Sequence, residues 1–300
     1  MTAAADVVVV GGGVAGGAVA TVLARGGLDV VVLERQTAYR DKVRGEVFLP
    51  WGAEEARTLG LEQVLLDAGG GYATRLGRFE EWIPPDEAES QAIPLDQLLP
   101  GVPGSLNVGH PQACEALVCE AEAAGARVVR GVGEVTMGTD GRTSVVYELD
   151  DLDHEICCRL VVGADGRRSG IRRQAGINLE ESPPASMAGG MLVDAPAWPA
   201  HLDATGTEGD VYCLVFPRPA GMVRVYLLWS LDQRGRFTGA GRSTPAGSTR
   251  SSCSSRSCNA RSSATATSPH ARTSSPSSSP SSATTTRRRN RSHGPTPATL

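Results

Sequence analysis

The sequence predicts a mixed α/β protein in which a half built on a parallel sheet precedes a β-sheet-rich region and a low-complexity tail. Three observations lead to this prediction. The chain opens with a strand–helix–strand unit of about thirty residues, the size typical of a βαβ motif. From about residue 186 the pattern changes to strands alone. Residues 241–300 contain no aromatic residue and no Val, Ile or Met, so they cannot build a core.

The opening unit consists of three segments. Residues 6–10 ("DVVVV") form an almost continuous apolar run, which is typical of a strand buried on both faces. Residues 14–25 are rich in alanine and favour a helix that ends at Gly26-Gly27, where glycine can adopt a positive φ. Residues 30–34 ("VVVLE") predict a second buried strand, parallel to the first.

The turn between the first strand and the helix has the sequence "GGGVAG" (11–16), a G-x-G-x-x-G pattern. Gly11 allows a tight turn, Gly13 lets the backbone approach a pyrophosphate, and Gly16 lets the helix pack close to the sheet. Val14 and Ala15 open a helix whose N-terminus offers free N–H groups and a positive dipole end to phosphates. The turn therefore predicts a Rossmann-like dinucleotide site.

Glu34 closes the second strand about twenty residues after the turn. An acidic side chain in this position binds ribose hydroxyls and would repel a 2′-phosphate. Arg35 follows it in the stretch "VVLER" and belongs to the same predicted cofactor set. These residues leave NAD and FAD as alternatives.

The rest of the first half alternates helices, strands and loops. We predict helices over 53–59, 62–67, 111–124 and 169–174; strands over 72–82, 126–130, 134–139, 143–149 and 160–163; and loops over 39–50, 83–90 and 98–105. The "TDGR" between two of these strands indicates a hairpin. Three further strands over 186–195, 210–219 and 221–230 predict a separate sheet after about residue 180, which the 72–82 strand is expected to join.

A second polar site follows the 160–163 strand in "VVGADGRRSG". Asp165 at the strand end can accept hydrogen bonds from cofactor hydroxyls or from the N–H groups of its own loop. Gly166 allows close approach, and Ser169 is a good N-cap for the helix that begins there. Arg167 and Arg168 are expected in solvent.

On these residues the chain resembles the flavin-dependent aromatic hydroxylases, the group A flavoprotein monooxygenases, over roughly residues 5–240. The match lies in the βαβ unit with "VVLER", in "RGE" (44–46) with the "PWGAEEARTLGL" that follows, and in "VVGADGRRSGIRR". The resemblance implies FAD near Asp165, NADH or NADPH as reductant, and Arg44 at the phosphate or ribose side of the cofactor. His110 stands where the family often has Arg or Gln close to the flavin.

The implied activity is oxygen-dependent hydroxylation of an aromatic or polyketide-like small molecule, and no catalytic base is assigned. A prenyl-chain reductase is an alternative, because "RGE" also resembles that group, and a halogenase is another. A third alternative is an inactive, truncated dinucleotide-binding module. It arises because the family's Gly-Asp motif after the substrate sheet is missing, and the resemblance therefore implies truncation at the C-terminus.

The tail carries 18 Ser and 9 Arg without any Asp or Glu, whereas the first 240 residues carry 20 basic and 33 acidic residues. We predict a cofactor domain over 1–178 (72–106 contributing to the substrate region), a partial substrate sheet over 179–240, and a disordered tail over 241–300. Such a composition is also what a GC-rich gene yields out of frame. A basic arm for nucleic acid or lipid, with Arg287–Arg289 as its contact, is the less favoured interpretation.

The seven cysteines include no C-x-x-C pair, so we predict no metal site. The N-terminus lacks a signal peptide pattern, and no segment is long and apolar enough to span a membrane. We expect a cytoplasmic protein that binds a small-molecule substrate and no nucleic acid. The sequence carries no indication of the oligomeric state.

Overall fold

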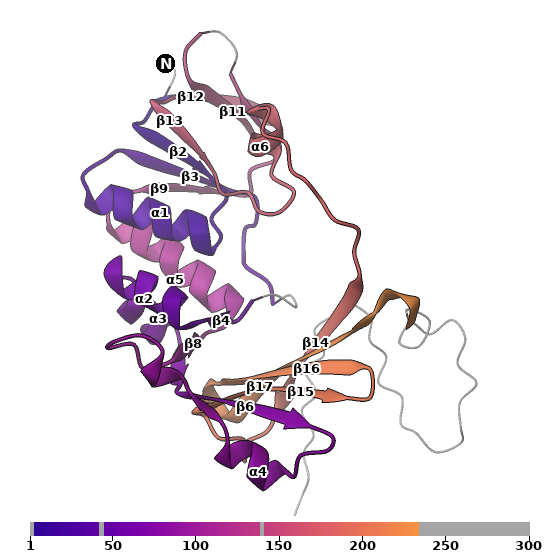
Figure 1. The fold of residues 1–300 in the computed structure, drawn as a ribbon. Coiled ribbons are helices and arrows are strands. Elements are labelled where there is room, and N and C mark those ends of the chain that lie inside the picture. Colours follow the sequence, from indigo (N-terminus) through magenta and orange to yellow (C-terminus); the bar gives the residue numbers. More distant parts are fainter. Residues whose placement is uncertain (1–2, 42–44, 139–140, 234–300) are drawn as a thin grey trace, which may run out of the picture. The chain divides into compact units, whose positions relative to one another are not determined.

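The computed structural model describes residues 3–41, 45–138 and 141–233 (Figure 1). The predictions for Arg44, for the first two residues (139–140) of the "TDGR" turn and for residues 241–300 lie outside the described residues. Within them the mixed α/β fold is confirmed, with a parallel sheet in the first half and a larger, strand-rich sheet after it.

The parallel sheet has the strand order β13-β2-β3-β9. All neighbours in this sheet run parallel. Its strands are β2 (Val7–Val10), β3 (Val30–Glu34), β9 (Arg127–Arg130) and β13 (Leu160–Gly163). Each of the four valines of β2 is buried, as the apolar run predicts. Between β2 and β3 the chain forms α1 (Val14–Arg25), which has the predicted bounds and is followed by Gly27 at φ +82°.

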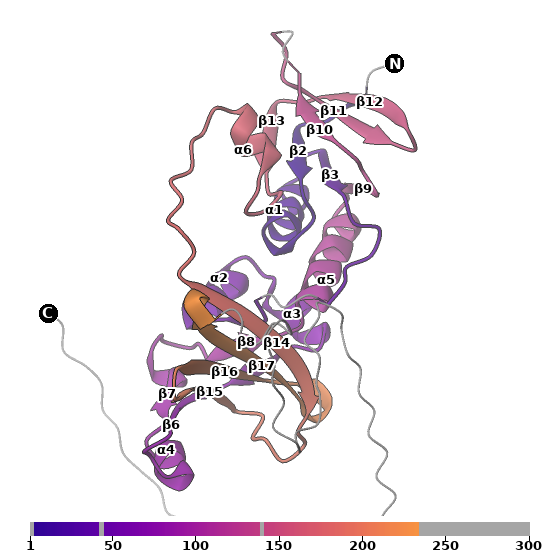
Figure 2. The same ribbon diagram turned by 90° about the vertical axis from the view of Figure 1, so that its right-hand side faces the viewer.

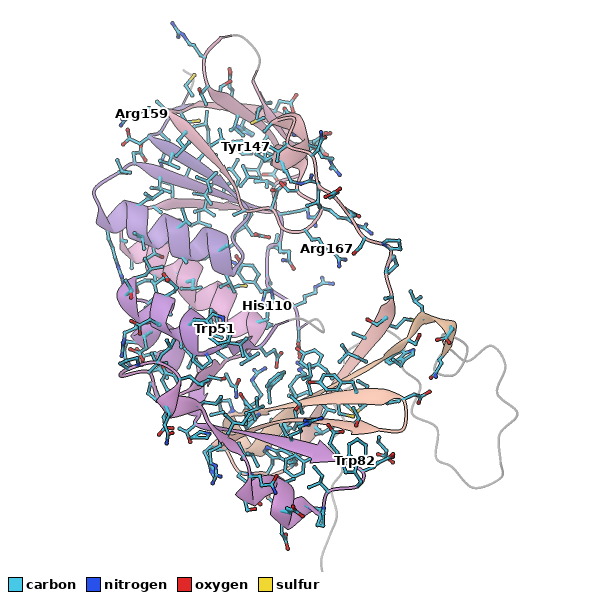
Figure 3. The ribbon with its side chains drawn as sticks, viewed as in Figure 1. Trp51, Trp82, His110, Tyr147, Arg159 and Arg167 are labelled. Atoms are coloured by element: carbon cyan, nitrogen blue, oxygen red, sulfur yellow. The ribbon has the colours of Figure 1, made fainter. Side chains whose placement is uncertain are left out.

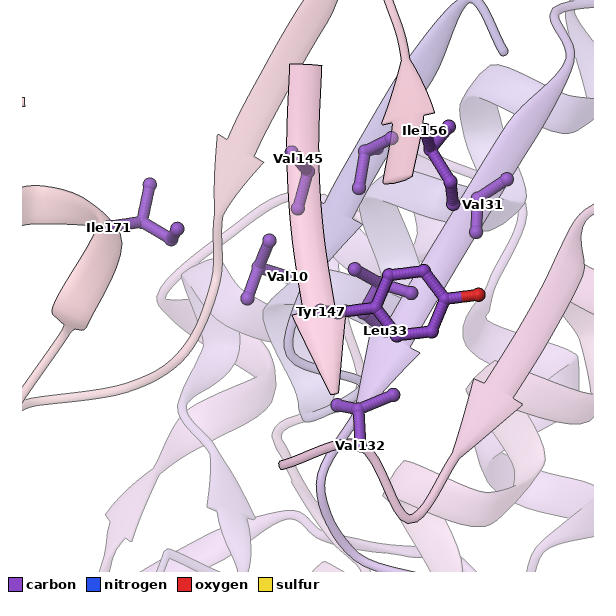
Figure 4. Packing of buried hydrophobic residues seen from close by; sticks show 9 residues of the cluster. Val10, Val31, Leu33, Val132, Val145, Tyr147, Ile156 and Ile171 are labelled. Carbon is purple, nitrogen blue, oxygen red and sulfur yellow. The ribbon is translucent and has the colours of Figure 1, made fainter. Parts of the chain in front are cut away.

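Side chains alternate between the two faces of the sheet along β2 and β3. They therefore contribute to two hydrophobic cores, one on each face. On one face, Val7 and Val9 pack with alanines of α1 and α5 (His110–Ala123). On the other face, Val8 and Val10 pack with Tyr147 and its neighbours from a second, antiparallel layer (Figure 4). Figures 1 and 2 agree on this sandwich of helices, parallel sheet and antiparallel sheet.

The antiparallel layer contains the predicted hairpin and two strands, β1 and β12, that were not predicted. Its order is β1-β12-β11-β10, with β1 (Ala3–Ala4), β10 (Val135–Met137), β11 (Ser144–Leu149) and β12 (Leu152–Cys157). The unpredicted strand β12 is mostly exposed and rich in charged residues. It turns back from β11 through Asp150 and Asp151, both at positive φ.

The strand-rich region is a six-stranded sheet of order β14-β17-β16-β15-β6-β7. Its strands are β6 (Arg75–Glu80), β7 (Ile93–Pro94), β14 (Ser186–Asp194), β15 (Leu202–Glu208), β16 (Val211–Arg218) and β17 (Met222–Ser230). The expected joining of the 72–82 segment is confirmed, since β6 pairs in parallel with β15. The single strand predicted there is wrong, because the chain breaks at Thr74 and its first part belongs to another sheet.

That other sheet is small and lies in the first half of the chain. It has the order β4-β8-β5, with β4 (Val47–Phe48), β5 (Gly71–Ala73) and β8 (Ser105–Asn107). Helices α2 (Pro50–Thr58), α3 (Glu62–Asp67) and α6 (Gly170–Gln174) occur close to the predicted bounds. Helix α4 (Pro85–Ser90) replaces a predicted loop. Pro85 at its first position and two acidic residues in its first turn favour this helix. None of the helices in the described part of the chain could span a membrane.

A buried polar contact joins β8 to the six-stranded sheet. Asp203, 2% exposed on β15, accepts a hydrogen bond of 2.7 Å from the Asn107 side chain. Burial raises the pKa of Asp203 to about 6 against the hydrogen bonds from Asn107 and Ser105, which lower it. The folded state thus disfavours the charged form of this carboxyl.

The free energy of unfolding should therefore fall as the pH rises. A pKa raised by folding gives stability that is present below the unfolded pKa, near 4, and is lost as the pH passes 6. The variant Asp203→Asn has no carboxyl group to titrate, so it should not lose this stability as the pH rises. Its amide oxygen can still accept the hydrogen bond from Asn107. Between pH 4 and pH 7 the free energy of unfolding of the variant, measured by urea denaturation, should rise by up to about 3 kcal/mol relative to that of the wild type. Asp153→Asn, an exposed change on β12, is the control. A difference that stays flat with pH would contradict the assignment.

Candidate functional site

The glycine turn between β2 and α1 is packed so closely that two of its glycines admit no side chain. A Cβ on Gly16 would lie 1.8 Å from the Gly11 carbonyl oxygen. A Cβ on Gly11, at φ +103°, would lie 2.4 Å from the carbonyl oxygen of Ala164 at the end of β13. The turn, the helix and the loop after β13 therefore meet backbone to backbone, and this places Asp165 beside the turn.

Gly13 differs from these two glycines, because no atom of the described residues beyond Gly13 itself and its two chain neighbours lies within 4 Å of the position of its Cβ. It is the N-cap of α1, and no side chain of the described residues caps the helix there. The first turn of α1 also contains no acidic residue. This open, uncapped and uncharged helix start fits an anionic group such as a pyrophosphate. Ala15 is exposed at this helix start.

Glu34 is buried at the end of β3 and faces the turn. Its Oε2 accepts from the Gly12 N–H at 2.6 Å, and its Oε1 accepts from the Gln36 N–H at 2.7 Å. A carboxylate offers about four acceptor positions, so each oxygen keeps capacity for a further donor. Arg35 is exposed just beyond the strand.

Asp165 acts within its own loop. Its Oδ2 accepts from the N–H groups of Gly170 (2.6 Å) and Ile171 (3.2 Å), and its Oδ1 accepts from the Ser169 hydroxyl. The carboxylate therefore organises the N-terminus of α6, the second of the two roles expected for it.

The contacts of Ser169 and the conformation of Gly166 are consistent with this role of Asp165 in organising its own loop. The predicted cap is confirmed, since the Ser169 hydroxyl oxygen accepts from the Arg172 N–H at 2.9 Å. Gly166 lies at φ +84°, a conformation that favours glycine. The Arg172 guanidinium donates to the Ile177 carbonyl. Arg167 (Figure 3) and Arg168 are exposed as expected. Whether Asp165 also binds a cofactor hydroxyl stays a prediction.

His110 begins α5 and is connected to the turn through Cys114, one helical turn later. The Cys114 sulfur lies 3.6 Å from His110 Nε2 and receives a hydrogen bond from the backbone of Val14. Burial raises the pKa of Cys114 to about 11, so the thiol stays protonated near neutral pH. The first turn of α5 and the start of α1 are thus neighbours.

A buried ion cluster next to the site was not predicted. Glu46, 1% exposed, accepts from Arg218 at 2.6 Å and from Arg224 at 3.0 Å, one guanidinium on each carboxylate oxygen. Arg224 also binds Asp41 at 2.7 Å. The "RGE" stretch drew attention to Glu46, but its partners lie more than 170 residues later, on β16 and β17.

The ion cluster connects the six-stranded sheet to the segment that follows Arg44. Arg218 also lies against the residue that precedes His110, because a Cβ on Gly109 would be 2.1 Å from its Nη2. Nearby, burial and the charge of Glu46 raise the pKa of Tyr226 to about 12. The Tyr226 hydroxyl therefore stays protonated and cannot serve as a base near neutral pH. Within the described residues, no group of three or more acidic, His or Cys side chains could hold a metal ion.

Replacing Glu46 by Gln should destabilise the chain by about 3–5 kcal/mol, because Arg218 loses its carboxylate partner and Arg224 keeps only Asp41. Urea denaturation measures the change. The matched control is Glu120→Gln, which removes the same charge from a partly exposed pair with Arg25 and should cost no more than about 1 kcal/mol. Equal effects of the two substitutions would show that the ion cluster is not a structural junction.

A family model described as "FAD binding domain" matches residues 4–294. Among curated proteins, the chain is 31% identical over 231 residues to menaquinone reductase of Mycobacterium tuberculosis (strain ATCC 25618 / H37Rv), covering 74% of this chain and 54% of that protein. It is 30% identical over 233 residues to digeranylgeranylglycerophospholipid reductase 2 of Methanopyrus kandleri, again covering 74% of this chain and 54% of the relative.

The fold is also similar to that of a flavoprotein/dehydrogenase from Cytophaga hutchinsonii, with a TM-score of 0.68 and 20% identity over 79% of this chain and 58% of that chain. The chain spans about half the length of the curated relatives it matches. The family match extends over most of the sequence and agrees with the G-x-G-x-x-G turn and the Asp165 loop. The chain therefore belongs to the FAD-binding-domain family, that of the group A flavoprotein monooxygenases.

Proposed function

We propose that this chain is an FAD-dependent monooxygenase that hydroxylates an aromatic or polyketide-like small molecule. The observation that carries the proposal is the open helix start at Gly13, in a chain whose family is defined by its FAD-binding domain. Bound FAD would supply the redox chemistry with oxygen. The protein would bind and orient cofactor and substrate and exclude water.

In this proposal the glycine turn holds the pyrophosphate, with the N–H groups at the start of α1 as donors. Glu34 binds the ribose hydroxyls through the acceptor positions that Gly12 and Gln36 leave free. The complete proposed cofactor set is Gly11, Gly13, Val14, Ala15, Gly16, Glu34, Arg35, Arg44, His110, Asp165 and Gly166.

The reductant in this proposal is NADH or NADPH, which the resemblance of the Asp165 loop to the family motif implies. Residues 1–178 would serve the cofactor and 179–240 the substrate, with 72–106 contributing to the substrate region. The pairing of β6 with β15 supports that last assignment, because it brings a strand from the first half into the six-stranded sheet. A cytoplasmic location belongs to the same proposal.

Reduction of a prenyl chain is the second candidate function. It is favoured by the printed names of the relatives that match 74% of the chain, a menaquinone reductase and a digeranylgeranylglycerophospholipid reductase. The halogenase alternative has no comparable support and stays a prediction. An inactive dinucleotide-binding module stays an alternative too.

Oxygen dependence separates the candidates. The FAD-loaded chain is incubated with NADH or NADPH and either a panel of phenolic and polyketide-like compounds or a prenylated quinone, with and without ¹⁸O₂. Monooxygenation predicts a product that carries one ¹⁸O atom and forms only in oxygen. A product that gains two hydrogens without oxygen would establish the reductase instead. An FAD-loaded chain that the nicotinamides do not reduce would support the inactive module.

Gly13→Val tests where FAD binds. The position is open and its φ of −69° and ψ of −172° suit valine, so the apoprotein should lose only about 1 kcal/mol of its free energy of unfolding, because valine is a poorer N-cap than glycine. The side chain would occupy the space of the pyrophosphate and should raise the Kd for FAD by more than about a hundredfold. Calorimetric titration measures the Kd.

Gly16→Ala is the contrasting variant of the same turn. Its Cβ would strike the Gly11 backbone, so it should destabilise the apoprotein by about 3 kcal/mol or more. A Gly13→Val chain with normal affinity for FAD would remove the turn from the proposed site.

A further inference from the structure

We propose that Tyr39 is a positioning residue of the cofactor site, whose hydroxyl orients the peptide between Gly12 and Gly13 so that its N–H faces the open helix start. This inference deepens the proposed FAD site and rests on it. Tyr39 lies in a segment predicted from the sequence as a loop, outside the three stretches that carry the family resemblance.

The first observation is the way the turn is held at Gly12. The Tyr39 hydroxyl donates to the Gly12 carbonyl oxygen at 2.5 Å, while the Gly12 N–H donates to Glu34. The peptides on both sides of Gly12 are therefore fixed by side chains. The packing is close, since a Cβ on Gly12 would lie 2.7 Å from the Tyr39 hydroxyl oxygen and 3.2 Å from Glu34 Oε2.

The planar trans peptide transmits this contact to the proposed ligand position. In such a peptide the carbonyl and the following N–H point in opposite directions. Because the Gly12 carbonyl is directed at Tyr39, the Gly13 N–H is directed away from it. Gly13 is also the residue whose Cβ position is open and whose carbonyl accepts the first hydrogen bond of α1, from Gly17 at 2.8 Å.

The second observation is that Tyr39 is itself held from two other elements. The guanidinium carbon of Arg130, at the end of β9, lies 5.2 Å from the centre of the Tyr39 ring, within the range of a cation–π contact. Arg130 in turn donates two hydrogen bonds, of 3.0 and 2.8 Å, to Glu115 on α5. The ring position is thus set by a chain of contacts independent of the turn.

The protonation state of Tyr39 suits a donor. Burial raises the pKa of its hydroxyl above the usual range, and the neighbouring carboxylate of Glu34 raises it further, against the lowering effect of Arg130. The hydroxyl therefore remains protonated near neutral pH, and its hydrogen bond to the carbonyl does not depend on pH in that range.

The test is Tyr39→Phe, which removes the hydroxyl and keeps the ring beneath Arg130. Tyr72→Phe is the matched control, because it removes a hydroxyl that donates at 2.6 Å to Glu62 in the α3–β5 region. Calorimetric titrations give the Kd for FAD and for ADP, which carries the pyrophosphate without the isoalloxazine. The melting temperature of each apoprotein is measured in parallel.

We expect Tyr39→Phe to weaken FAD and ADP by the same factor, about 2- to 12-fold, the equivalent of one net hydrogen bond. Tyr72→Phe should leave both affinities unchanged. A Tyr39→Phe chain with wild-type affinities would overturn the inference alone, and so would one that loses affinity for FAD but not for ADP. A wild-type chain that binds neither ligand would overturn the proposed function as well.

Discussion

No side chain fits between the glycine turn, helix α1 and the end of strand β13, and the cofactor half of the molecule depends on this constraint. Gly16 lies against the Gly11 backbone, and Gly11 lies against Ala164. The turn and α1, which are contiguous in the sequence, therefore meet the end of β13, about 150 residues later, at one edge of the parallel sheet. The valines of β2 and β3 pack into hydrophobic cores on both faces of the sheet, so the turn follows a strand that is held from both sides. The open space at Gly13 is the part of this arrangement left for a ligand.

Buried charge connects this half to the six-stranded sheet. Glu46 forms ion pairs with Arg218 and Arg224, which lie on two adjacent strands, and the segment that contains Glu46 follows directly on the proposed cofactor residue Arg44. Removing a charge from such a cluster leaves its partners buried without compensation, so the contact is specific even if its net contribution to stability is small. A displacement of β16 or β17 would therefore shift the ion partners of Glu46, which lies two residues after the proposed cofactor residue Arg44.

The sequence predicted the parts of the fold that depend on local pattern. The apolar runs and terminating glycines located β2, α1, β3 and β13 to the residue or nearly so. Strand β12 was not predicted because its exposed charged residues hide the alternation of apolar and polar residues that is typical of a strand. In strand β15, small and polar residues hide the same alternation. At the candidate site, the capping role of Ser169 was predicted from the local sequence. The partners of Glu46 and of Gly12 come from distant segments, so no local sequence pattern indicates them. Such pairings follow from the tertiary fold alone.

The central claim is that the chain holds a dinucleotide by its pyrophosphate at the start of α1. The most direct measurement is a calorimetric titration of the apoprotein with FAD and, separately, with FMN, which has the isoalloxazine and one phosphate but lacks the AMP moiety and therefore the pyrophosphate. The account predicts binding of one FAD per chain and no measurable binding of FMN. Binding of FMN as tight as that of FAD, or binding of neither, would contradict it.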